Sequence, residues 1–576
     1  MNHSSPLGVC VLAKVRPNQP NCTSHGQYIT EILEHAGLPF SQIELTELSP
    51  ELKLLITVGD APLEEDATAA LQQWVQNGGC WLSLGSVCRL GEVHGVQQVS
   101  SPGDGAREFV YPQSTLGEGY LKPSQKHPVL AHLNINLHYY NGIVVKVLSS
   151  AATVLATTQN AHGHDSKNPA LVESTFGDGH TLFLAPDAVG AVVRISQGTT
   201  VIADGVPAPD GSAPTADGVL KCDDGLVLDW EFDRQEVPGV PGLKGFFEPV
   251  ADQWREVILR GIFYLAAKAG MALPMLWLYP RNLPALAHLS HDTDGNDPAL
   301  GARLLEEVNK AEINSTWCVI PEGYPKDLIK NIKASGHELA THYNALDHPW
   351  SEEEFAAQVA RLKVLFGEQP VSNKNHYTRW EGGTEFFDWC HRQKLQLDQT
   401  KGPSKLGEVG FTFGSAQLHF PLADNGEIHP VLEQPLHTQD LVIFAPPQII
   451  PPMLDAVEKH HGVLHILFHP AHIAKPGVAD SLHSAITQAK ERGLEWFTAK
   501  QLNAWERARR KIKLQWQIEE KDTAPKVLLS APEPLAGATI LVLGHHQNIE
   551  IDGQLYAAQT STRWGFEFSA VTLGME

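Results

Sequence analysis

A strand-length apolar run followed by an amphipathic helix recurs along the middle of the chain, from about residue 280 to 508. The expected strands are 285–290, 315–320, 337–342, 372–377, 395–400, 441–445, 463–468 and 494–499. The expected helices include 298–312, 351–367 and 481–493. Repeated β/α units of this length are typical of parallel strands joined by helices. This region therefore predicts a closed or nearly closed (β/α) barrel at 280–508.

The chain before the barrel, 1–275, has its own β/α rhythm. Apolar runs at 7–15, 52–60 and 80–86 predict strands, and 27–38 and 62–79 predict the helices between them. HTLFLAPD at 180–187 reads as a later strand of the same sheet, and 254–270 has helical periodicity. We expect a doubly wound parallel sheet here, which makes the protein α/β in class.

Two stretches do not fit the β/α pattern. Residues 195–245 are rich in Gly, Pro and Asp, which predicts a long ordered loop or small β insertion in the first domain. In KIKLQWQI at 511–518, apolar residues 512, 514, 516 and 518 alternate with polar ones, and 538–544 and 565–573 are further strand candidates. The tail at 510–576 therefore predicts a small all-β domain, a sandwich or a single sheet.

Length, charge and cysteine content limit the functions. A chain of 576 residues is too long for one core, which agrees with three domains. The net charge of −23 argues against nucleic acid and anionic membrane surfaces as partners. Seven scattered cysteines without CxxC spacing predict neither a disulfide framework nor a zinc knuckle. With no apparent signal peptide and no apolar stretch of membrane-spanning length, we expect a cytoplasmic protein.

Polar side chains follow most of the expected barrel strands. The stretch LAHLSHDTDGNDP at 286–298 passes from apolar residues to two histidines, three aspartates and a glycine. Groups able to bind a metal or move a proton follow the first, third, fourth, fifth and seventh strands: His291, Asp292, Asp294, His342, His348, His376, Arg379, Asp398, His469 and His472. Because strand carboxyl ends meet on one face of a barrel, these groups predict a metal and acid/base site there.

The same residues resemble a known family. SHDTDG, GHELATH with a later histidine, HYTRW, the aspartate of LQLDQT and LFHP follow the order found in the polysaccharide deacetylases of carbohydrate esterase family four. The resemblance covers roughly 230 residues, about 285 to 505. It implies a deacetylase-type barrel and a metal-dependent hydrolase that removes an N-acyl group, expected to be acetyl, from a sugar derivative or related small molecule.

The resemblance also implies a role for each matching residue. Asp294, His342 and His348 would hold a divalent metal, Zn²⁺ first, with Co²⁺, Ni²⁺ or Mn²⁺ as alternatives. Asp292 would be the catalytic base and His469 the general acid. Arg379 would orient the base, and Asp398 would tune the acid histidine. The expected substrate contacts are Leu467, Trp380 and His376.

Three departures from the family pattern leave alternatives open. Thr293 separates the two aspartates, which are usually adjacent. His348 lies six residues after His342 instead of four, so His291 or Asp347 could replace it as the third ligand. Arg379 is not followed by the usual proline, and the site stretch therefore resembles a divergent branch of the family.

The first domain resembles the class I glutamine-amidotransferase-like fold, through LLITVGDAPLEEDATAALQQWVQNGGCWLSLGS. Cys88 lies three residues from each flanking glycine, and a nucleophile elbow needs tighter spacing, so Cys88 is interpreted as structural. Two other functions stay open for the whole chain: a non-catalytic carbohydrate-binding or assembly protein, and a hydrolase of another non-peptide C–N bond, such as a ring amide. A homo-oligomer is also compatible with the sequence.

Overall fold

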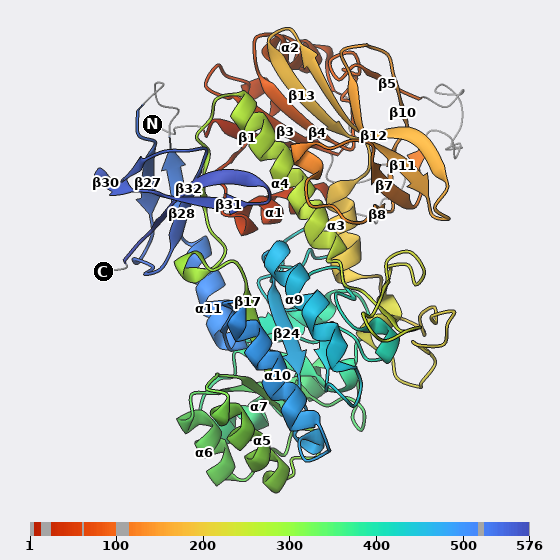
Figure 1. Ribbon diagram of the computed structural model, residues 1–576, viewed down its shortest axis with the longest axis vertical. Coiled ribbons are helices and arrows are strands. Elements are labelled where there is room, and N and C mark those ends of the chain that lie inside the picture. Colours follow the sequence, from red (N-terminus) through yellow and green to blue (C-terminus); the bar gives the residue numbers. More distant parts are fainter. Residues whose placement is uncertain (1–4, 13–24, 60–62, 100–114, 517–522, 575–576) are drawn as a thin grey trace. The chain divides into compact units, whose positions relative to one another are not determined.

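The computed structural model describes residues 5–12, 25–59, 63–99, 115–516 and 523–574. Two compact units make up the chain, and Figure 1 colours the chain by residue number. The first contains Met1–Val193, Gln253–Asn282 and Ala508–Glu576, and the second contains Arg194–Asp252 and Leu283–Arg507. The tail thus clusters with the N-terminal region, and 195–245 clusters with the barrel region. The division into domains 1–275, 280–508 and 510–576 stays a prediction beside this grouping.

The first unit is built on a nine-stranded mixed sheet. Its strands in spatial order are β2 (Ser41–Gln42), β1 (Leu7–Val11), β3 (Leu54–Val58), β4 (Cys80–Leu84), β13 (Gly179–Leu184), β12 (Asp165–Phe176), β11 (Thr153–Asn160), β7 (Gly119–Pro123) and β8 (Leu137–Tyr139). The first five are parallel, as the β/α rhythm predicts. The other four pair antiparallel, which the sequence analysis missed. A short turn links β11 to β12, and a link of that length can join only antiparallel neighbours.

Helices of the first unit match the expected amphipathic segments. Helix α1 (Ile29–His35) joins β1 to the β2–β3 region, and α2 (Glu65–Gln76) joins β3 to β4. Helix α1 is followed by Gly37 at φ 71°, a conformation that suits glycine at a helix end. Helix α4 (Val250–Lys268) agrees with the predicted segment 254–270.

The tail forms two small four-stranded sheets, and one takes a strand from outside the tail. The first has the order β16 (Pro274–Leu276), β28 (Thr539–Leu543), β32 (Phe566–Thr572) and β31 (Gln559–Arg563). The second has the order β26 (Lys513–Trp516), β27 (Lys526–Ser530), β29 (Asn548–Ile551) and β30 (Gln554–Ala557). The alternation in β26 is confirmed, because Leu514 and Trp516 are buried while Lys513 and Gln515 are exposed. Residue 518 lies outside the described ranges.

The second unit contains a parallel sheet of nine strands that forms a half-barrel. The order is β22 (Leu432–Glu433), β21 (Leu397–Asp398), β20 (Ser372–Asn375), β19 (Glu338–Tyr343), β18 (Thr316–Val319), β17 (Leu286–Asp292), β24 (Val463–Leu467) and β23 (Thr438–Gln439), and β25 (Glu495–Trp496) also pairs with β17. Among the described strands, β22 and β23 stand at the two ends of this order. The sheet is therefore open where a closed barrel would pair them.

One predicted strand of this unit is wrong. Residues 441–445 form a turn, and the strand at this place is β23, which ends just before it. The backbone oxygen of Asp440 accepts hydrogen bonds from the N–H groups of Ile443 (3.1 Å) and Phe444 (2.9 Å), which closes the turn. Strand β22 was missed, because its two residues are too few to make a periodic pattern.

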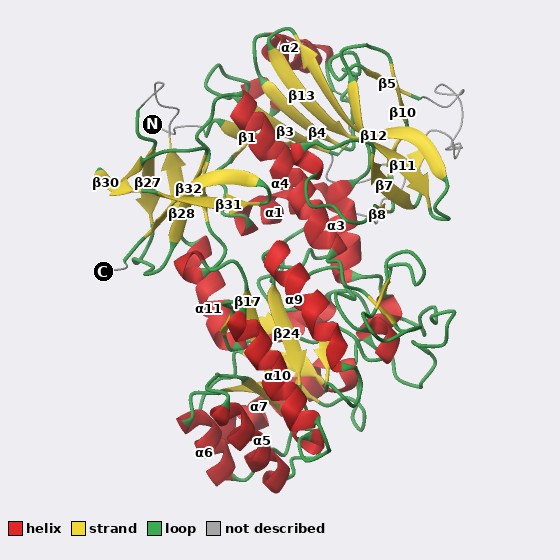
Figure 2. Ribbon diagram, viewed as in Figure 1, coloured by secondary structure: helices red, strands yellow, loops and turns green. Residues whose placement is uncertain are grey.

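Helices surround the strands of the second unit, as Figure 2 shows. They are α5 (Pro298–Lys310), α6 (Lys326–Ala334), α7 (Glu352–Phe366), α8 (Glu385–Arg392), α9 (Ile450–Lys459), α10 (Val478–Glu491) and α11 (Ala499–Arg510). Asp297 caps α5 by accepting hydrogen bonds from the next N–H groups, and Ser351 caps α7. The core between sheet and helices includes Leu289 and Ile466 of the strands with Leu482 of α10.

Segment 195–245 pairs with the barrel region at two places, and Phe246, the residue after it, pairs at a third. Isolated bridges join Val201 to Gly382, Lys221 to Arg379, and Phe246 to Gly410. The segment also holds a short hairpin of β14 (Gln235–Glu236) and β15 (Lys244–Gly245). It is thus an ordered insertion packed beside the loop that follows β20. In the described part of the chain, no helix has the length and apolar character needed to cross a bilayer.

Candidate metal and acid/base site

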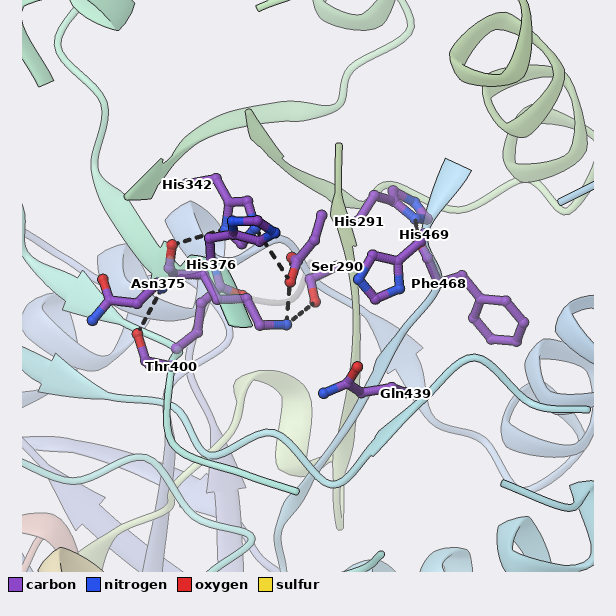
Figure 3. Close-up of polar contacts among 12 residues, drawn as sticks. Ser290, His291, His342, Asn375, His376, Thr400, Gln439, Phe468 and His469 are labelled. Atoms are coloured by element: carbon purple, nitrogen blue, oxygen red, sulfur yellow. Dashed lines mark hydrogen bonds and ion pairs between the residues drawn. The ribbon is translucent and has the colours of Figure 1, made fainter. Parts of the chain in front are cut away.

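The carboxyl ends of four parallel strands bring the candidate residues together. Asp292 is the last residue of β17, and His342 lies near the end of β19. His376 directly follows β20, and His469 follows β24. Figure 3 shows His342 and His376 on one side of Ser290 and His469 on the other. The expected convergence at one end of the sheet is therefore present.

Asp294, His342 and His376 form a group with metal-ligand geometry. Each offers one ligand atom, and these atoms lie within 4.8 Å of one another. Asp294 Oδ1 is 3.4 Å from His342 Nε2 and 3.6 Å from His376 Nε2. Asp294 has a left-handed backbone (φ 39°), which is uncommon outside glycine and typical of constrained sites.

The second nitrogen of each imidazole is already occupied. His342 Nδ1 lies 2.9 Å from the backbone oxygen of Lys374, and His376 Nδ1 lies 3.2 Å from Asn344 Oδ1. Such contacts fix the tautomer so that Nε2 carries the free lone pair. His342 Nε2 and Asp294 Oδ1 are buried and make no hydrogen bond to the described residues. Two buried, unbonded acceptors facing each other fit a cation between them.

Protonation in this group also suits a metal. Burial would raise the pKa of Asp294, but its close contact with His342 and the charges of His469, His342 and His376 hold the pKa well below the usual range. Burial lowers the pKa of His376 to about 4, and the neighbouring charge of His342 adds to that. An ionised aspartate and a neutral imidazole are the forms that bind divalent metals.

The other candidates for the third ligand lie elsewhere. The side chain of His348 is 44% exposed, and its Nδ1 is 3.6 Å from Glu354 Oε1. Asp347 is exposed in the same loop. His291 is buried with both nitrogens in contact, with the Phe468 oxygen (2.9 Å) and Ser315 Oγ (3.1 Å), and burial lowers its pKa to about 3. The histidine in the group is thus His376, which the sequence analysis assigned to substrate contact.

Lys374, and not Arg379, lies beside Asp292. Lys374 Nζ is 3.5 Å from Asp292 Oδ1 and 3.3 Å from Ser290 Oγ, and its side chain is fully buried. Arg379 Nε donates to Glu381 Oε1 (3.1 Å), and its Nη1 donates to the Ala345 oxygen. Arg379 follows a turn at 377–378, where two residues have positive φ, and this turn separates it from the strand end.

Asp440, and not Asp398, lies beside His469. Asp440 Oδ2 is hydrogen-bonded to His469 Nδ1, and Oδ1 accepts the His469 backbone N–H at 2.8 Å. Burial would lower the pKa of His469, but the negative charges of Asp440, Asp292 and Asp294 raise it to about 9. Asp398 instead accepts hydrogen bonds from Asn373 Nδ2 (2.8 Å) and the Thr400 N–H (3.0 Å). Placing the strand at 438–439 would have marked Asp440 as a polar strand end.

The predicted substrate contacts occupy different environments. Trp380 is 2% exposed and packs against Phe386 and Phe387, so it is a core residue. Leu467 ends β24 and is buried two residues before His469.

Two exposed aromatic side chains that were not among the expected site residues lie close to the site. The ring centroid of Tyr377 lies 6.1 Å from that of His376, and the ring centroid of Phe444 lies 6.5 Å from that of His469. Their exposed fractions are 51% and 41%. Each is available to contact a bound molecule, unlike Trp380.

In the first unit, Cys88 lies just after β4. Its thiol is buried and lies 4.0 Å from Thr57 Oγ1, and its N–H donates to Ser86 Oγ at 3.0 Å. The structural interpretation of Cys88, and the resemblance to an amidotransferase-like domain, stay predictions.

Comparison with protein-family models gives no match, and neither does comparison with curated proteins. Several solved structures resemble part of this chain at low identity. A structure from Mycobacterium smegmatis, assigned as a polysaccharide deacetylase, is 16% identical over 40% of this chain and 92% of its own, with a TM-score of 0.32. The PuuE allantoinase is 15% identical over 39% of this chain and 91% of its own, with a TM-score of 0.32. A family 4 acetyl xylan esterase from Clostridium thermocellum, solved with a cobalt ion, is 17% identical over 38% of this chain and 90% of its own, with a TM-score of 0.24. Overlaps this partial assign no role to any residue, so the case for the site depends on its own side chains.

Proposed function

We propose that the protein is a metal-dependent hydrolase that removes an N-acyl group, acetyl in the first instance, from a sugar derivative or related small molecule. The observation that carries the proposal is the group Asp294, His342 and His376, with Asp292 and His469 beside it. One carboxylate and two imidazoles leave coordination positions open, as in catalytic zinc sites. Zn²⁺ is the first choice of ion for such donors, and Co²⁺, Ni²⁺ and Mn²⁺ are alternatives.

A divalent ion bound to this group supplies a Lewis acid and lowers the pKa of water. Asp292 is the base that takes the proton from the attacking water. The buried Nζ of Lys374 lies 3.5 Å from Asp292 Oδ1, and this ion pair fixes the direction of the carboxylate.

His469 is the acid that gives a proton to the leaving nitrogen. Its Nδ1 is hydrogen-bonded to Asp440, which leaves Nε2 to face the site, 3.7 Å from Asp294 Oδ2. The negative charges around the ring raise its pKa to about 9, so the imidazolium is the main form at neutral pH. Leu467 and the exposed rings of Tyr377 and Phe444 supply apolar surface for the acyl group and for the face of a sugar.

The test measures metal content and turnover in the same set of variants. We expect about one tightly bound divalent ion per chain, lost in His376→Ala and kept in His348→Ala, the matched control from the neighbouring loop. Asp292→Asn should keep the ion and lose turnover by roughly 10²–10⁴-fold, the usual contribution of a general base. The substrates are a panel of N-acetylated amino sugars, with cyclic amides beside them to detect cleavage of a different C–N bond. Full turnover in Asp292→Asn, or tight metal in His376→Ala and none in His348→Ala, would contradict the assignment.

A further inference from the structure

A second group of metal-ligating side chains lies next to the first. Asp440, His469 and His472 each offer one ligand atom, again within 4.8 Å of one another. His472 Nδ1 is 3.0 Å from Asp440 Oδ2, the oxygen that also contacts His469 Nδ1. We propose that these three residues form a second divalent-cation site, and that an ion bound there inhibits the enzyme. The inhibitory part depends on the proposed function, because it assumes that His469 acts as the acid.

The short 3-10 helix at Pro470–His472 directs both histidines toward the same carboxylate. His469 caps this turn, and the His472 N–H donates to the His469 oxygen at 3.1 Å. Residues three apart in a 3-10 turn point the same way, so HPAH presents two imidazoles side by side. Their ring centroids are 5.5 Å apart. This spacing leaves both Nδ1 atoms facing Asp440.

Asp440 is held rigidly at the centre of the group. Its side chain is fully buried, and Oδ1 is fixed by the backbone N–H of His469 at 2.8 Å. The turn that follows it is closed by two hydrogen bonds to its own backbone oxygen. Oδ2 is therefore the atom left to face a cation.

His472 brings a buried nitrogen that lacks a hydrogen bond. Its Nδ1 is buried and forms no hydrogen bond with the described residues, although Asp440 Oδ2 is 3.0 Å away. A buried polar atom without a hydrogen bond is costly unless something else satisfies it. A cation between Nδ1 and Oδ2 would satisfy it. The side chains of His469 and His472 are 12% and 19% exposed, so an ion from solvent can reach them.

The donor set favours zinc and similar ions. Two imidazole nitrogens and one carboxylate oxygen match the ligands of tetrahedral zinc, with solvent as the fourth ligand. The described residues offer three ligands here, as at the Asp294 site, but one of them, His469, must give up its hydrogen bond to Asp440. We therefore expect this second site to be weaker than the Asp294 site, and to fill only after it.

An ion bound at the second site prevents His469 from acting as the general acid. A metal ion on His469 Nδ1 takes the position of the proton that Asp440 stabilises, which leaves a neutral ring with its remaining proton on Nε2. Once that ring has no imidazolium form, it cannot give a proton to the leaving nitrogen and regain it from solvent. Turnover should therefore rise with zinc up to one ion per chain and fall as the second ion binds.

The experiment titrates the metal-free protein with zinc and counts the ions bound per chain from the signal of a competing chromophoric chelator. The titration is repeated with Co²⁺, and the absorption of tetrahedral cobalt is recorded. The wild type should bind two ions, the second more weakly. His472→Ala should bind one, and Asp294→Ala should keep only the weaker ion. His483→Ala, which changes a partly exposed histidine on α10, should keep both. His472→Gln serves as the second variant should His472→Ala not fold, with circular dichroism checking each protein.

Inhibition is measured on the same proteins wherever a substrate is found. Zinc beyond one equivalent should slow the wild type and have no such effect on His472→Ala. A wild type that binds a single ion, lost in Asp294→Ala, would overturn the second site and leave the proposed function standing. Two ions in His472→Ala would also overturn it. If Asp294→Ala loses nothing and His472→Ala loses the tight ion, the proposed function fails instead.

Discussion

Replacing Asp440 by Asn removes one negative charge beside His469 and changes almost nothing in shape. The asparagine oxygen can still accept a hydrogen bond from the His469 backbone or ring. The amide NH2 that replaces the other oxygen cannot accept, so the substitution removes the charge of Asp440 together with one of its two hydrogen bonds to His469. We expect the pKa of His469 in the metal-free protein to fall from about 9 to below its ordinary value of 6.5, because burial then opposes the charged ring with less compensation.

The size of the effect follows from the His469 environment. Burial disfavours the imidazolium, and the rise from 6.5 to about 9 occurs in spite of it, with Asp440 as the largest favourable neighbour. Since each tenfold change in an acid constant is worth about 1.4 kcal/mol, the rise corresponds to roughly 3 kcal/mol. Asp292 and Asp294 supply the rest of the electrostatic rise in the pKa of His469. Asp440→Asn should therefore cost on the order of 3 kcal/mol of folding stability at pH 6, because Asp440 also offsets the burial of the ring.

The pH dependence has a definite sign. His469 has a folded pKa above its unfolded value, so its contribution is complete below about pH 6.5 and is lost as pH rises through about 9. Asp440 has a lowered pKa: burial would raise it, but the charge of His469 outweighs burial. The contribution of the pair is therefore also lost in acid, below the unfolded value of 3.8. The stability difference between wild type and Asp440→Asn should be largest between these limits.

The assay is an NMR titration of ¹³C-labelled histidine rings in metal-free protein, with His469→Gln used to assign the resonance. Asp398→Asn is the matched control, because it alters another buried aspartate whose hydrogen bonds go to Asn373 and Thr400. It should leave the His469 titration near pH 9. Thermal unfolding of wild type and Asp440→Asn at pH 6 and pH 10 checks the stability term. An unchanged His469 pKa in Asp440→Asn, or an equal loss of stability at both pH values, would refute the reasoning.

Two further substitutions test the base and the core. Lys374→Met should lower turnover by at least about 10²-fold with metal content unchanged, because Asp292 would be left as an unpaired buried carboxylate. Lys374→Arg should recover part of the rate. Equal turnover in Lys374→Met and the wild type would remove Lys374 from the mechanism. Trp380→Ala should destabilise the second unit by roughly 3–5 kcal/mol in denaturant unfolding, as expected for truncating a buried Trp; unchanged stability with weaker substrate binding would instead restore Trp380 as a substrate contact.

Much of the framework was predictable from the sequence. The strand that ends in Asp292, the helix capped by Asp297 and the alternation of β26 follow from local periodicity and capping, which neighbouring residues encode. Parallel strands place their carboxyl ends together, so His342 and His469 could be assigned to one site without coordinates. The antiparallel half of the first sheet was missed because β11 and β12, although long, do not alternate strictly between buried and exposed residues.

The partners of the site residues depended on the tertiary structure. His376, Lys374 and Asp440 replace His348, Arg379 and Asp398 beside the residues they were expected to assist. Each replacement lies within a few residues of a strand end, where a turn decides which side chain faces the site. Register between β19 and β20 sets Lys374 opposite His342, and the end of β23 sets Asp440 beside His469. Composition and order along the chain determine which chemical groups are available. Only strand register and turn geometry, which depend on contacts between distant segments, determine which of them meet.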